Sequence, residues 1–421
     1  MNSPLDSAPP PRTLASLVVV YLTVFLDLLG FGLILPLLPF YAMRFGAHGK
    51  QIGLLFACFS IAQLIGAPIL GRLSDRVGRR PVLIVCLLGS TLSLLATGLT
   101  DTLYTLMAAR AFAGLFGGSI ATAQAYVADV TLPAERTKYM GLVGASIGMG
   151  FVFGPFVGAE LSRWGFSTAA FVAAALSAAN LLLALFALRE SLPPSARGKS
   201  QRVPLSVASL KAALSRPVVG PLLLITMLST LAFVAMESTF ALFAKQRYGF
   251  SEQTMGRLFA AIGVVIAIVQ GGFIGPLAKR FGEVAIGTVG FAILTLGFFA
   301  IPWMPNRGLM MAALLLVAIG QGLLAPSLST LLSRAASATE QGGTLGFSQS
   351  LSSMSRAIGP ILAGALFDWF PPLPYAMAVG MASAMAVFLS RQRQTCSRVR
   401  SKTMLGHLSM VWLSRQSFSA K

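Results

Sequence analysis

The chain has 421 residues, of which 55% are hydrophobic and only 11% are charged, and its mean hydropathy is +0.77. The charged residues are mostly basic and give a formal net charge of +19. This composition excludes a disordered basic protein and a soluble nucleic-acid-binding protein, because neither carries repeated apolar segments of about 20 residues. We therefore expect no nucleic acid partner, and we expect the basic residues to mark one side of a membrane.

Apolar segments long enough to cross a bilayer recur along the whole chain. A transmembrane β-barrel would show shorter segments of alternating hydrophobicity instead. The sequence therefore predicts an all-α integral membrane protein with twelve transmembrane helices. The apolar segments are 14–41, 51–70, 81–100, 103–126, 139–161, 167–188, 217–242, 255–275, 284–301, 308–331, 344–367 and 373–390.

Two halves of the chain are related in sequence. The segment GRLSDRVG at 71–78 recurs about 205 residues later as GPLAKRFG at 275–282, and the Gly-Pro pair at 154–155 recurs at 359–360. Several matches at one offset indicate an internal duplication, which is common among secondary transporters. The duplication predicts two pseudo-symmetric bundles of six helices.

A polar and basic stretch separates the two sets of six segments. It predicts an N-terminal six-helix bundle at 1–188, a cytoplasmic linker at 189–216 and a C-terminal six-helix bundle at 217–390. A basic cytoplasmic tail at 391–421 follows. If the N-terminus lies inside, most of the 32 lysine and arginine residues fall on the cytoplasmic side, which predicts that both termini are cytoplasmic.

Cysteine and histidine are too sparse for a metal site or a disulfide framework. The chain has three cysteines and two histidines, and they are scattered along it. We expect no metal and no cofactor.

Four charged residues lie within the predicted spans and away from the span ends: Asp27, Arg110, Glu237 and Arg356. Each costs about 2.5–3.5 kcal/mol at a helix centre on insertion scales, so each is expected to face a cavity or a partner. Asp27 and Arg110 lie at compatible depths, which permits contact directly or through water. Proton coupling is one interpretation of this pair, and a static ion pair is the alternative. Glu237 could be a second proton carrier, a substrate contact, the partner of Arg356 or an acid at the membrane interface.

The connection between the second and third spans carries the sequence GRLSDRVGRR at 71–80. Its glycines permit a tight turn, Asp75 could accept hydrogen bonds from a helix N-terminus, and Arg79 could pair with Asp129. We interpret this connection as a conformational latch. Its proposed members are Gly71, Asp75, Arg76, Gly78, Arg79, Arg80 and Asp129.

The second half lacks both carboxylates of this latch. Lys279 stands where the first half has Asp75, and Arg334 stands where it has Asp129. The latch is therefore expected in the first half alone. A loop that merely sets membrane orientation is the alternative, but it would need neither the aspartate nor the glycines.

The fifth span is rich in small residues around a proline. Gly150, Gly154, Pro155 and Gly158 predict a tight, kinked seam against the other half, because small residues let helices approach closely and proline weakens the backbone ladder. Generic membrane packing is the alternative.

Side-chain amides supply polar groups that could face a substrate. Together with the 29 phenylalanines they would suit an amphipathic solute, although they would equally suit ordinary helix packing. The candidate cavity residues are Gln63, Gln124, Gln270, Gln321, Gln349 and Arg356.

Taken together, these features resemble the major facilitator superfamily, and within it the bacterial drug–proton antiporters of the tetracycline-resistance type. The resemblance covers about residues 14–390 and is carried by the segments 27–39, 71–80, 110–114 and 150–158. It implies the latch role of the loop, proton coupling at Arg110 and an antiporter-type fifth span.

The resemblance has limits. Tetracycline carriers have acids in spans three and nine and a histidine in span eight, where this chain has Ser93, Leu294 and Ile266. The resemblance therefore does not imply tetracycline as the substrate. It implies a monomeric transporter of the bacterial inner membrane that exchanges protons for a small amphipathic solute by alternating access.

Two other functions stay open at this point. One is a proton-coupled importer of a sugar or another metabolite on the same fold. The other is a membrane-embedded enzyme, for which the sequence offers no nucleophile–base pair and no nucleotide-binding loop. We therefore expect the chain not to be an enzyme.

Overall fold

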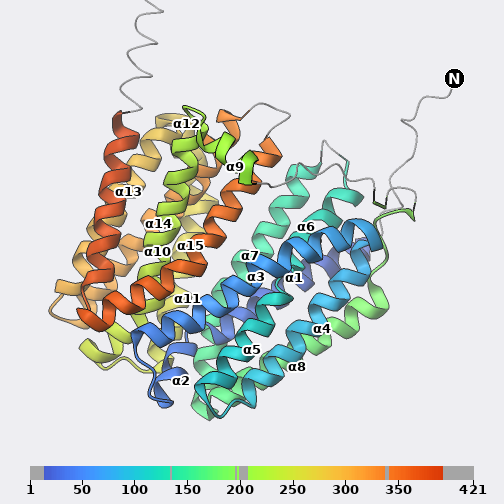
Figure 1. Ribbon diagram of the computed structural model, residues 1–421, viewed down its shortest axis with the longest axis horizontal. Coiled ribbons are helices and arrows are strands. Elements are labelled where there is room, and N and C mark those ends of the chain that lie inside the picture. Colours follow the sequence, from blue (N-terminus) through green and yellow to red (C-terminus); the bar gives the residue numbers. More distant parts are fainter. Residues whose placement is uncertain (1–13, 133–134, 195–196, 199–206, 337–340, 392–421) are drawn as a thin grey trace, which may run out of the picture.

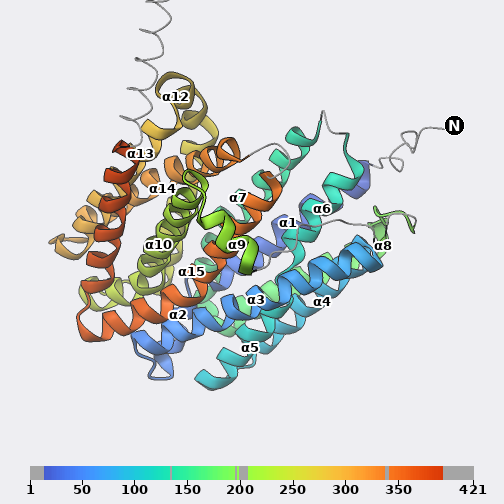
Figure 2. The same cartoon turned by 45° about the horizontal axis from the view of Figure 1, so that its top comes forward.

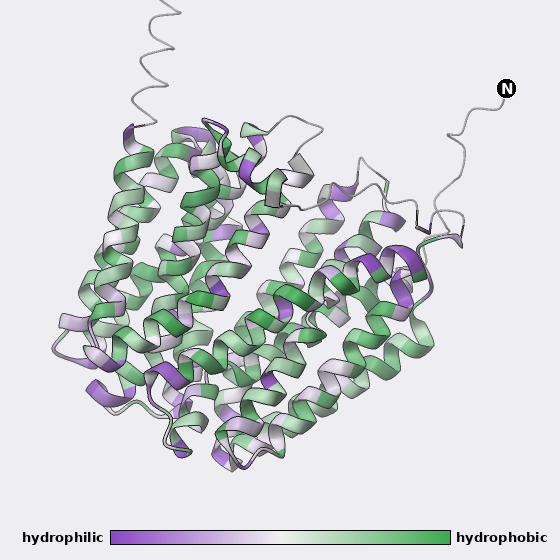
Figure 3. Cartoon of the chain, viewed as in Figure 1, coloured by the Kyte–Doolittle hydropathy of each residue, from purple (hydrophilic) through white to green (hydrophobic). Residues whose placement is uncertain are grey.

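The computed structural model describes residues 14–132, 135–194, 197–198, 207–336 and 341–391, and the described residues form helices and turns without a β-strand. The predicted terminal segment 1–13 and most of the basic tail at 391–421 lie outside these residues. Two bundles stand side by side (Figure 1). Apolar residues cover the middle of the helices and polar residues gather at both ends (Figure 3), as expected for a protein that spans a bilayer.

The elements of the first bundle are α1 (Leu14–Ile34), α2 (Leu38–Arg44), α3 (Gly49–Val77), α4 (Arg79–Gly98), α5 (Leu103–Leu115), α6 (Ser119–Val130), α7 (Arg136–Leu161), the 3-10 turn η1 (Ser162–Trp164) and α8 (Phe166–Ala187). A short helix, α9 (Val207–Leu214), lies between the bundles in sequence. The elements of the second bundle are α10 (Val219–Tyr248), α11 (Glu252–Ile268), the π-helical turn η3 (Val269–Phe273), α12 (Ile274–Phe281), α13 (Glu283–Ala300), the 3-10 turn η4 (Ile301–Trp303), α14 (Arg307–Ala335), α15 (Gln341–Trp369) and the last helix (Leu373–Arg391).

Eleven helices within the described residues are long and apolar enough to cross a membrane. The predicted span at 344–367 is the twelfth: it forms α15, which has the same length as α3 but carries Arg356, Asp368 and several serines. All twelve predicted segments are therefore helical within the described residues, and eleven of them qualify as membrane spans by length and composition. The polar residues of α15 have a structural reason, since this helix lies in the interface between the bundles.

Two predicted spans are interrupted. The first bends after α1, where residues 35–37 form a turn before α2, and the fourth bends at 116–118 between α5 and α6. Pro36 and Pro39 lie at the first interruption, and Gly117 and Gly118 at the second, so both breaks coincide with residues that disfavour a continuous helix.

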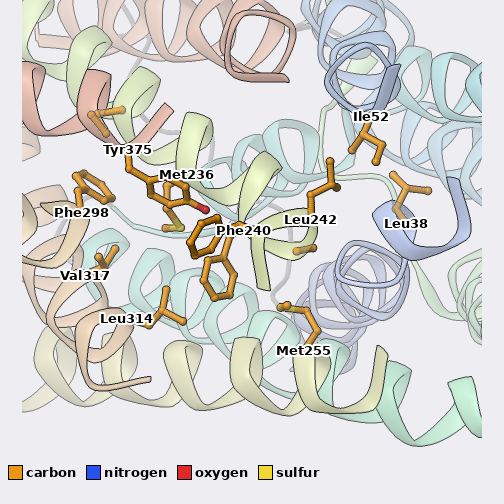
Figure 4. Packing of buried hydrophobic residues seen from close by; sticks show 14 of the residues in the cluster. Leu38, Ile52, Met236, Phe240, Leu242, Met255, Phe298, Leu314, Val317 and Tyr375 are labelled. Atoms are coloured by element: carbon orange, nitrogen blue, oxygen red, sulfur yellow. The ribbon is translucent and has the colours of Figure 1, made fainter. Parts of the chain in front are cut away.

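The two bundles meet at one end and diverge toward the other (Figures 1 and 2). We call the end that carries α9 and the start of α1 the linker end, and the opposite end, which carries α2, the far end. The main hydrophobic cluster joins the bundles near the far end (Figure 4). It includes Leu38 and Ile52 of the first bundle and Leu242, Met255 and Tyr375 of the second.

The close approach at the far end depends on glycine. A Cβ atom on Gly53 would lie 2.0 Å from the carbonyl oxygen of Pro360, and one on Gly364 would lie 2.1 Å from the carbonyl oxygen of Gly49. The α3 and α15 backbones therefore touch directly. A cavity lies between the bundles beyond this contact.

Candidate functional site

A central cavity of about 320 Å³ is lined by both bundles. Its walls carry all four ionisable residues that the sequence places within spans: Asp27 on α1, Arg110 on α5, Glu237 on α10 and Arg356 on α15. The rest of the lining mixes apolar and aromatic residues, such as Phe31, with six serines and two glutamines. The cavity therefore combines opposite charges with both polar and apolar surface.

Asp27 is held by hydroxyl groups. Its carboxylate accepts a hydrogen bond from Ser119 Oγ at the start of α6, and Oδ1 accepts another from Ser90 Oγ of α4 at 3.4 Å. No ion pair joins Asp27 to Arg110 in the part of the chain that the structure describes. Both side chains line the same cavity, and an interaction between them stays a prediction.

Arg110 is 4% exposed and lies against aromatic rings. The centre of its guanidinium group is 4.8 Å from the ring centroid of Phe59 and 5.8 Å from that of Phe31, both within the range of a cation–π interaction. Its buried Nε atom has no hydrogen-bond partner among the described residues. The rings replace part of the hydration that this cation loses on burial.

Glu237 and Arg356 line the cavity from the second bundle. Arg356 lies close enough to Glu237 to interact with it electrostatically, but no ion pair between them is found within the described residues. Glu237 is half-buried, and Arg356 is exposed at the cavity wall. Each bundle thus contributes one acid and one arginine to the cavity.

Two of the five candidate amides, Gln63 and Gln349, line the cavity. Gln63 Nε2 donates a 3.1 Å hydrogen bond to the carbonyl oxygen of Gly117, which ties α3 to the break between α5 and α6. The lining of this cavity does not include Gln124, Gln270 or Gln321. Side-chain direction, which depends on helix rotation, was not readable from the sequence.

The predicted latch residues form a charged cluster at the linker end. Arg79 Nη1 bonds to the carboxylate of Asp75, and Arg79 Nε donates to Asp129 at 3.0 Å. Arg79 Nη1 also donates to Ser74 Oγ at 2.8 Å, and Ser191 Oγ donates to Asp129 at 3.2 Å. The expected contact between Arg79 and Asp129 is present, and it links α4 to α6.

Glu190 is a member of this cluster that sequence reasoning missed. Its carboxylate accepts from the backbone N–H groups of Arg79 at 2.8 Å and Arg80 at 3.2 Å. These are the first residues of α4, where N–H groups lack intrahelical partners and a negative charge is favourable. The sequence suggested Asp75 for this capping role and placed Glu190 in the linker. An acid directly after the sixth apolar segment was the available signal.

The remaining latch candidates occupy different environments. Gly71 is buried, and Gly78 has a positive φ of 125° beside the Glu190 carboxylate. Arg80 Nη2 donates a 2.7 Å hydrogen bond to the carbonyl oxygen of Leu185, whereas Arg76 is exposed.

The seam on the fifth span points mainly to its own bundle, which corrects the expectation of contact with the other half. Cβ atoms on Gly150, Gly154 and Gly158 would collide with residues 28–33 of α1 at 2.3–2.8 Å. The contact with the second bundle uses a neighbouring face, where the carbonyl oxygen of Pro155 and the side chain of Ala159 lie against Gly256 of α11. Helical periodicity alone does not tell which neighbour a small-residue face meets.

Comparison with known proteins gives this arrangement a family. A model of the Major Facilitator Superfamily matches residues 20–307 and 272–411. The chain belongs to the major facilitator superfamily. It is 33% identical over 356 residues to the class C tetracycline resistance protein of Escherichia coli, covering 84% of this chain and 89% of that protein.

A second curated relative and a solved structure show the same similarity. Multidrug resistance protein 1 of Bacillus subtilis (strain 168) is 28% identical over 377 residues, which cover 88% of this chain and 96% of that protein. The crystal structure of the human organic anion transporter MFSD10 superposes with a TM-score of 0.68 at 27% identity, covering 91% of this chain and all of that one. This protein is therefore a multi-pass membrane transporter of small molecules and not an enzyme.

Proposed function

We propose that this major facilitator protein is a proton-coupled exporter of small amphipathic molecules that works by alternating access. The observation that carries the proposal is the central cavity, whose walls come from both bundles and hold two acids and two arginines. A site between two bundles becomes accessible from either side when the bundles rock against each other. A cavity of about 320 Å³ is at the lower end of the size range of small-molecule sites.

The linker end is taken as cytoplasmic, with both termini on that side of a bacterial inner membrane. The distribution of lysine and arginine supports this orientation. The conformation, closed at the far end, is then inward-open. The linker at 189–216 would connect the two moving bundles at 1–188 and 217–390.

Asp27 is the proposed proton carrier, with Glu237 as a second. The hydroxyl partners of Asp27 belong to α4 and α6 of its own bundle, whereas part of the cavity wall belongs to the second bundle. Rocking of the bundles would therefore change the access of water to Asp27 while its hydrogen bonds stay within the first bundle. Arg110 would act in the coupling through its charge beside Asp27 in the same cavity. Gln63, Gln349 and Arg356 are proposed substrate contacts.

Export is favoured over import by the relatives. A tetracycline resistance protein and a multidrug resistance protein are 33% and 28% identical to this chain over most of its length. The glycine-rich fifth span, packed tightly on α1, is proposed to be the antiporter-type seam. The loop cluster around Arg79 is proposed to be the latch that stabilises one conformational state.

Transport assays in proteoliposomes test this proposal. Purified protein would be screened for counterflow with a panel of drugs and metabolites, and a hit would then be assayed with an imposed pH gradient. We expect the gradient to drive movement of the solute against the proton flow. The variant Asp27→Asn should lose proton-driven transport and retain counterflow, because the binding cavity remains while the ionisable group is gone.

Ser93→Ala is the matched control, since Ser93 lines the same cavity and its hydroxyl donates to the backbone of its own helix. It should transport like the unmodified protein. Proton-driven transport by Asp27→Asn at the unmodified rate would refute the role of Asp27. Solute accumulation in the same direction as proton flow would indicate an importer.

A further inference from the structure

The far end of the bundle interface is held by acidic side chains that reach from one bundle to the other. Arg44 Nη2 of the first bundle bonds to Glu252 of α11 at 2.8 Å, and Arg257 of α11 donates to Glu160 of α7 at 2.8 and 2.5 Å. The arginines of these pairs are more than half exposed, so each pair contributes little. The third contact has a different chemistry.

The third contact is a helix cap supplied by the opposite bundle. Asp368, one residue before the end of α15, accepts hydrogen bonds from the backbone N–H groups of Gly49 at 2.7 Å and Lys50 at 2.8 Å. Gly49 and Lys50 are the first two residues of α3, whose N–H groups have no partner within their own helix. A carboxylate at a helix N-terminus gains from both charged hydrogen bonds and the helix dipole.

Glycine at the first position of α3 permits the close approach of α15. A Cβ atom on Gly49 would lie 2.7 Å from both Asp368 Oδ1 and the carbonyl oxygen of Gly364. The preceding N–H group, that of His48, is taken up by Gln51 Oε1 within the first bundle at 2.9 Å. Two of the N-terminal groups of α3 are thus satisfied from the second bundle, and separation of the bundles at this end breaks both bonds together.

We propose that Asp368 is a positioning residue that clasps the far end of the interface and sets the balance between the two conformations of the transport cycle. It acts through α3 and touches neither the solute nor the proton carrier. This inference rests on the alternating access of the proposed function. Loss of the clasp should favour the state that is open at the far end, where water can solvate the exposed N–H groups.

Distance measurements between the bundles test the clasp. Spin labels would replace Tyr104 at the start of α5 and Trp303 in η4, which are 82% and 62% exposed at the far end, in a background where serine replaces the three native cysteines. Pulsed electron resonance in lipid nanodiscs then reports the separation of the two bundles. Asp368→Ala should raise the ratio of long to short distances about tenfold, which corresponds to about 1.4 kcal/mol.

Two variants separate the clasp from a general loss of structure. Asp368→Glu keeps the carboxylate, so it should retain most of the short-distance population that Asp368→Ala loses. Asp101→Asn, at an exposed acid in the turn between α4 and α5 at the same end, should leave the distribution unchanged.

A folded Asp368→Ala protein with the distance distribution of the unmodified protein would overturn the clasp, as would a failure of Asp368→Glu to restore it. If the distances shift as expected but no variant moves protons in liposomes, the clasp stands and the proposed proton coupling fails.

Discussion

The two linker-end loops of this transporter descend from one duplicated sequence but differ in what surrounds them. In the first bundle, between α3 and α4, Arg79 is buried and bonded to both Asp75 and Asp129. In the second bundle, Lys279 of α12 and Arg334 near the end of α14 stand at the positions of the two carboxylates. Arg334 instead makes an exposed pair with Glu283. Among the described residues, the arginine bonded to two aspartates belongs to the first bundle, and an arginine–glutamate pair stands at the corresponding place in the second.

The helices that lead into these two loops also differ between the bundles. The α3 helix continues regularly to Val77, next to its cluster, whereas the α11 segment changes to the π-helical turn η3 before α12. No side chain of α12 is buried in this conformation. The linker ends of the two bundles therefore differ in helix geometry and in side-chain burial as well as in charge.

Removal of the buried arginine should give the largest difference in stability between a first-bundle variant and its second-bundle counterpart. Arg79→Ala leaves Asp75 and Asp129 without their shared partner, and breaking a buried charge network costs about 3–5 kcal/mol. Thermal unfolding in detergent should show a clearly lowered midpoint. Arg334→Ala is the matched change in the second bundle and should cost less than about 1 kcal/mol, because its pair is exposed. Equal losses would contradict the asymmetry.

Substitution of the two loop glycines should give a smaller difference in stability. Gly78 and Gly282 have φ values of 125° and 78°, in a region that side chains disfavour at about 1–3 kcal/mol. A Cβ atom at Gly78 would in addition lie 2.2 Å from the Glu190 carboxylate, whereas nothing lies within 4 Å of one at Gly282. Gly78→Ala should therefore lower the unfolding midpoint further than Gly282→Ala. The reverse order would show that Glu190 moves aside freely.

Removal of the acidic residues at the starts of α4 and α13 should give the smallest difference in stability. Glu190→Ala removes the acceptor from the first two N–H groups of α4 and should cost about 1–2 kcal/mol. Glu283→Ala changes the first residue of α13, which the structure shows in a surface ion pair, and should cost less than about 1 kcal/mol. Hydrogen exchange at the first turns of α4 and α13 would resolve the two effects, and equal protection in both variants would argue against a capping role for Glu190.

The sequence predicted the helices and the ionisable residues better than it predicted their partners. Charges are rare in membrane spans, so Asp27, Arg110, Glu237 and Arg356 could be singled out by composition alone, and all four line the cavity. The pairing of Arg79 with Asp129 followed from opposite charges at adjacent helix ends. These features depend on the hydropathy of each segment and on the position of a residue along its span, and both can be determined from the sequence.

Contacts that depend on helix rotation or on the other bundle were not predictable in this way. The small residues of the fifth span turn toward α1. Asp27 bonds to hydroxyl groups of Ser90 and Ser119 and not to Arg110, which lines the same cavity. Asp368 follows the predicted span at 344–367 directly, and its cap on α3 could be recognised only with the two bundles placed together.

Proton movement driven by the solute is the most direct test of the proposed exchange. Proteoliposomes without an initial pH gradient would be loaded with a transported solute and diluted, while a trapped pH-sensitive dye reports the interior. Outward solute flow should acidify the interior in the unmodified protein and leave it unchanged in Asp27→Asn. Solute efflux from the unmodified protein with no change of interior pH would contradict proton-coupled exchange through this cavity.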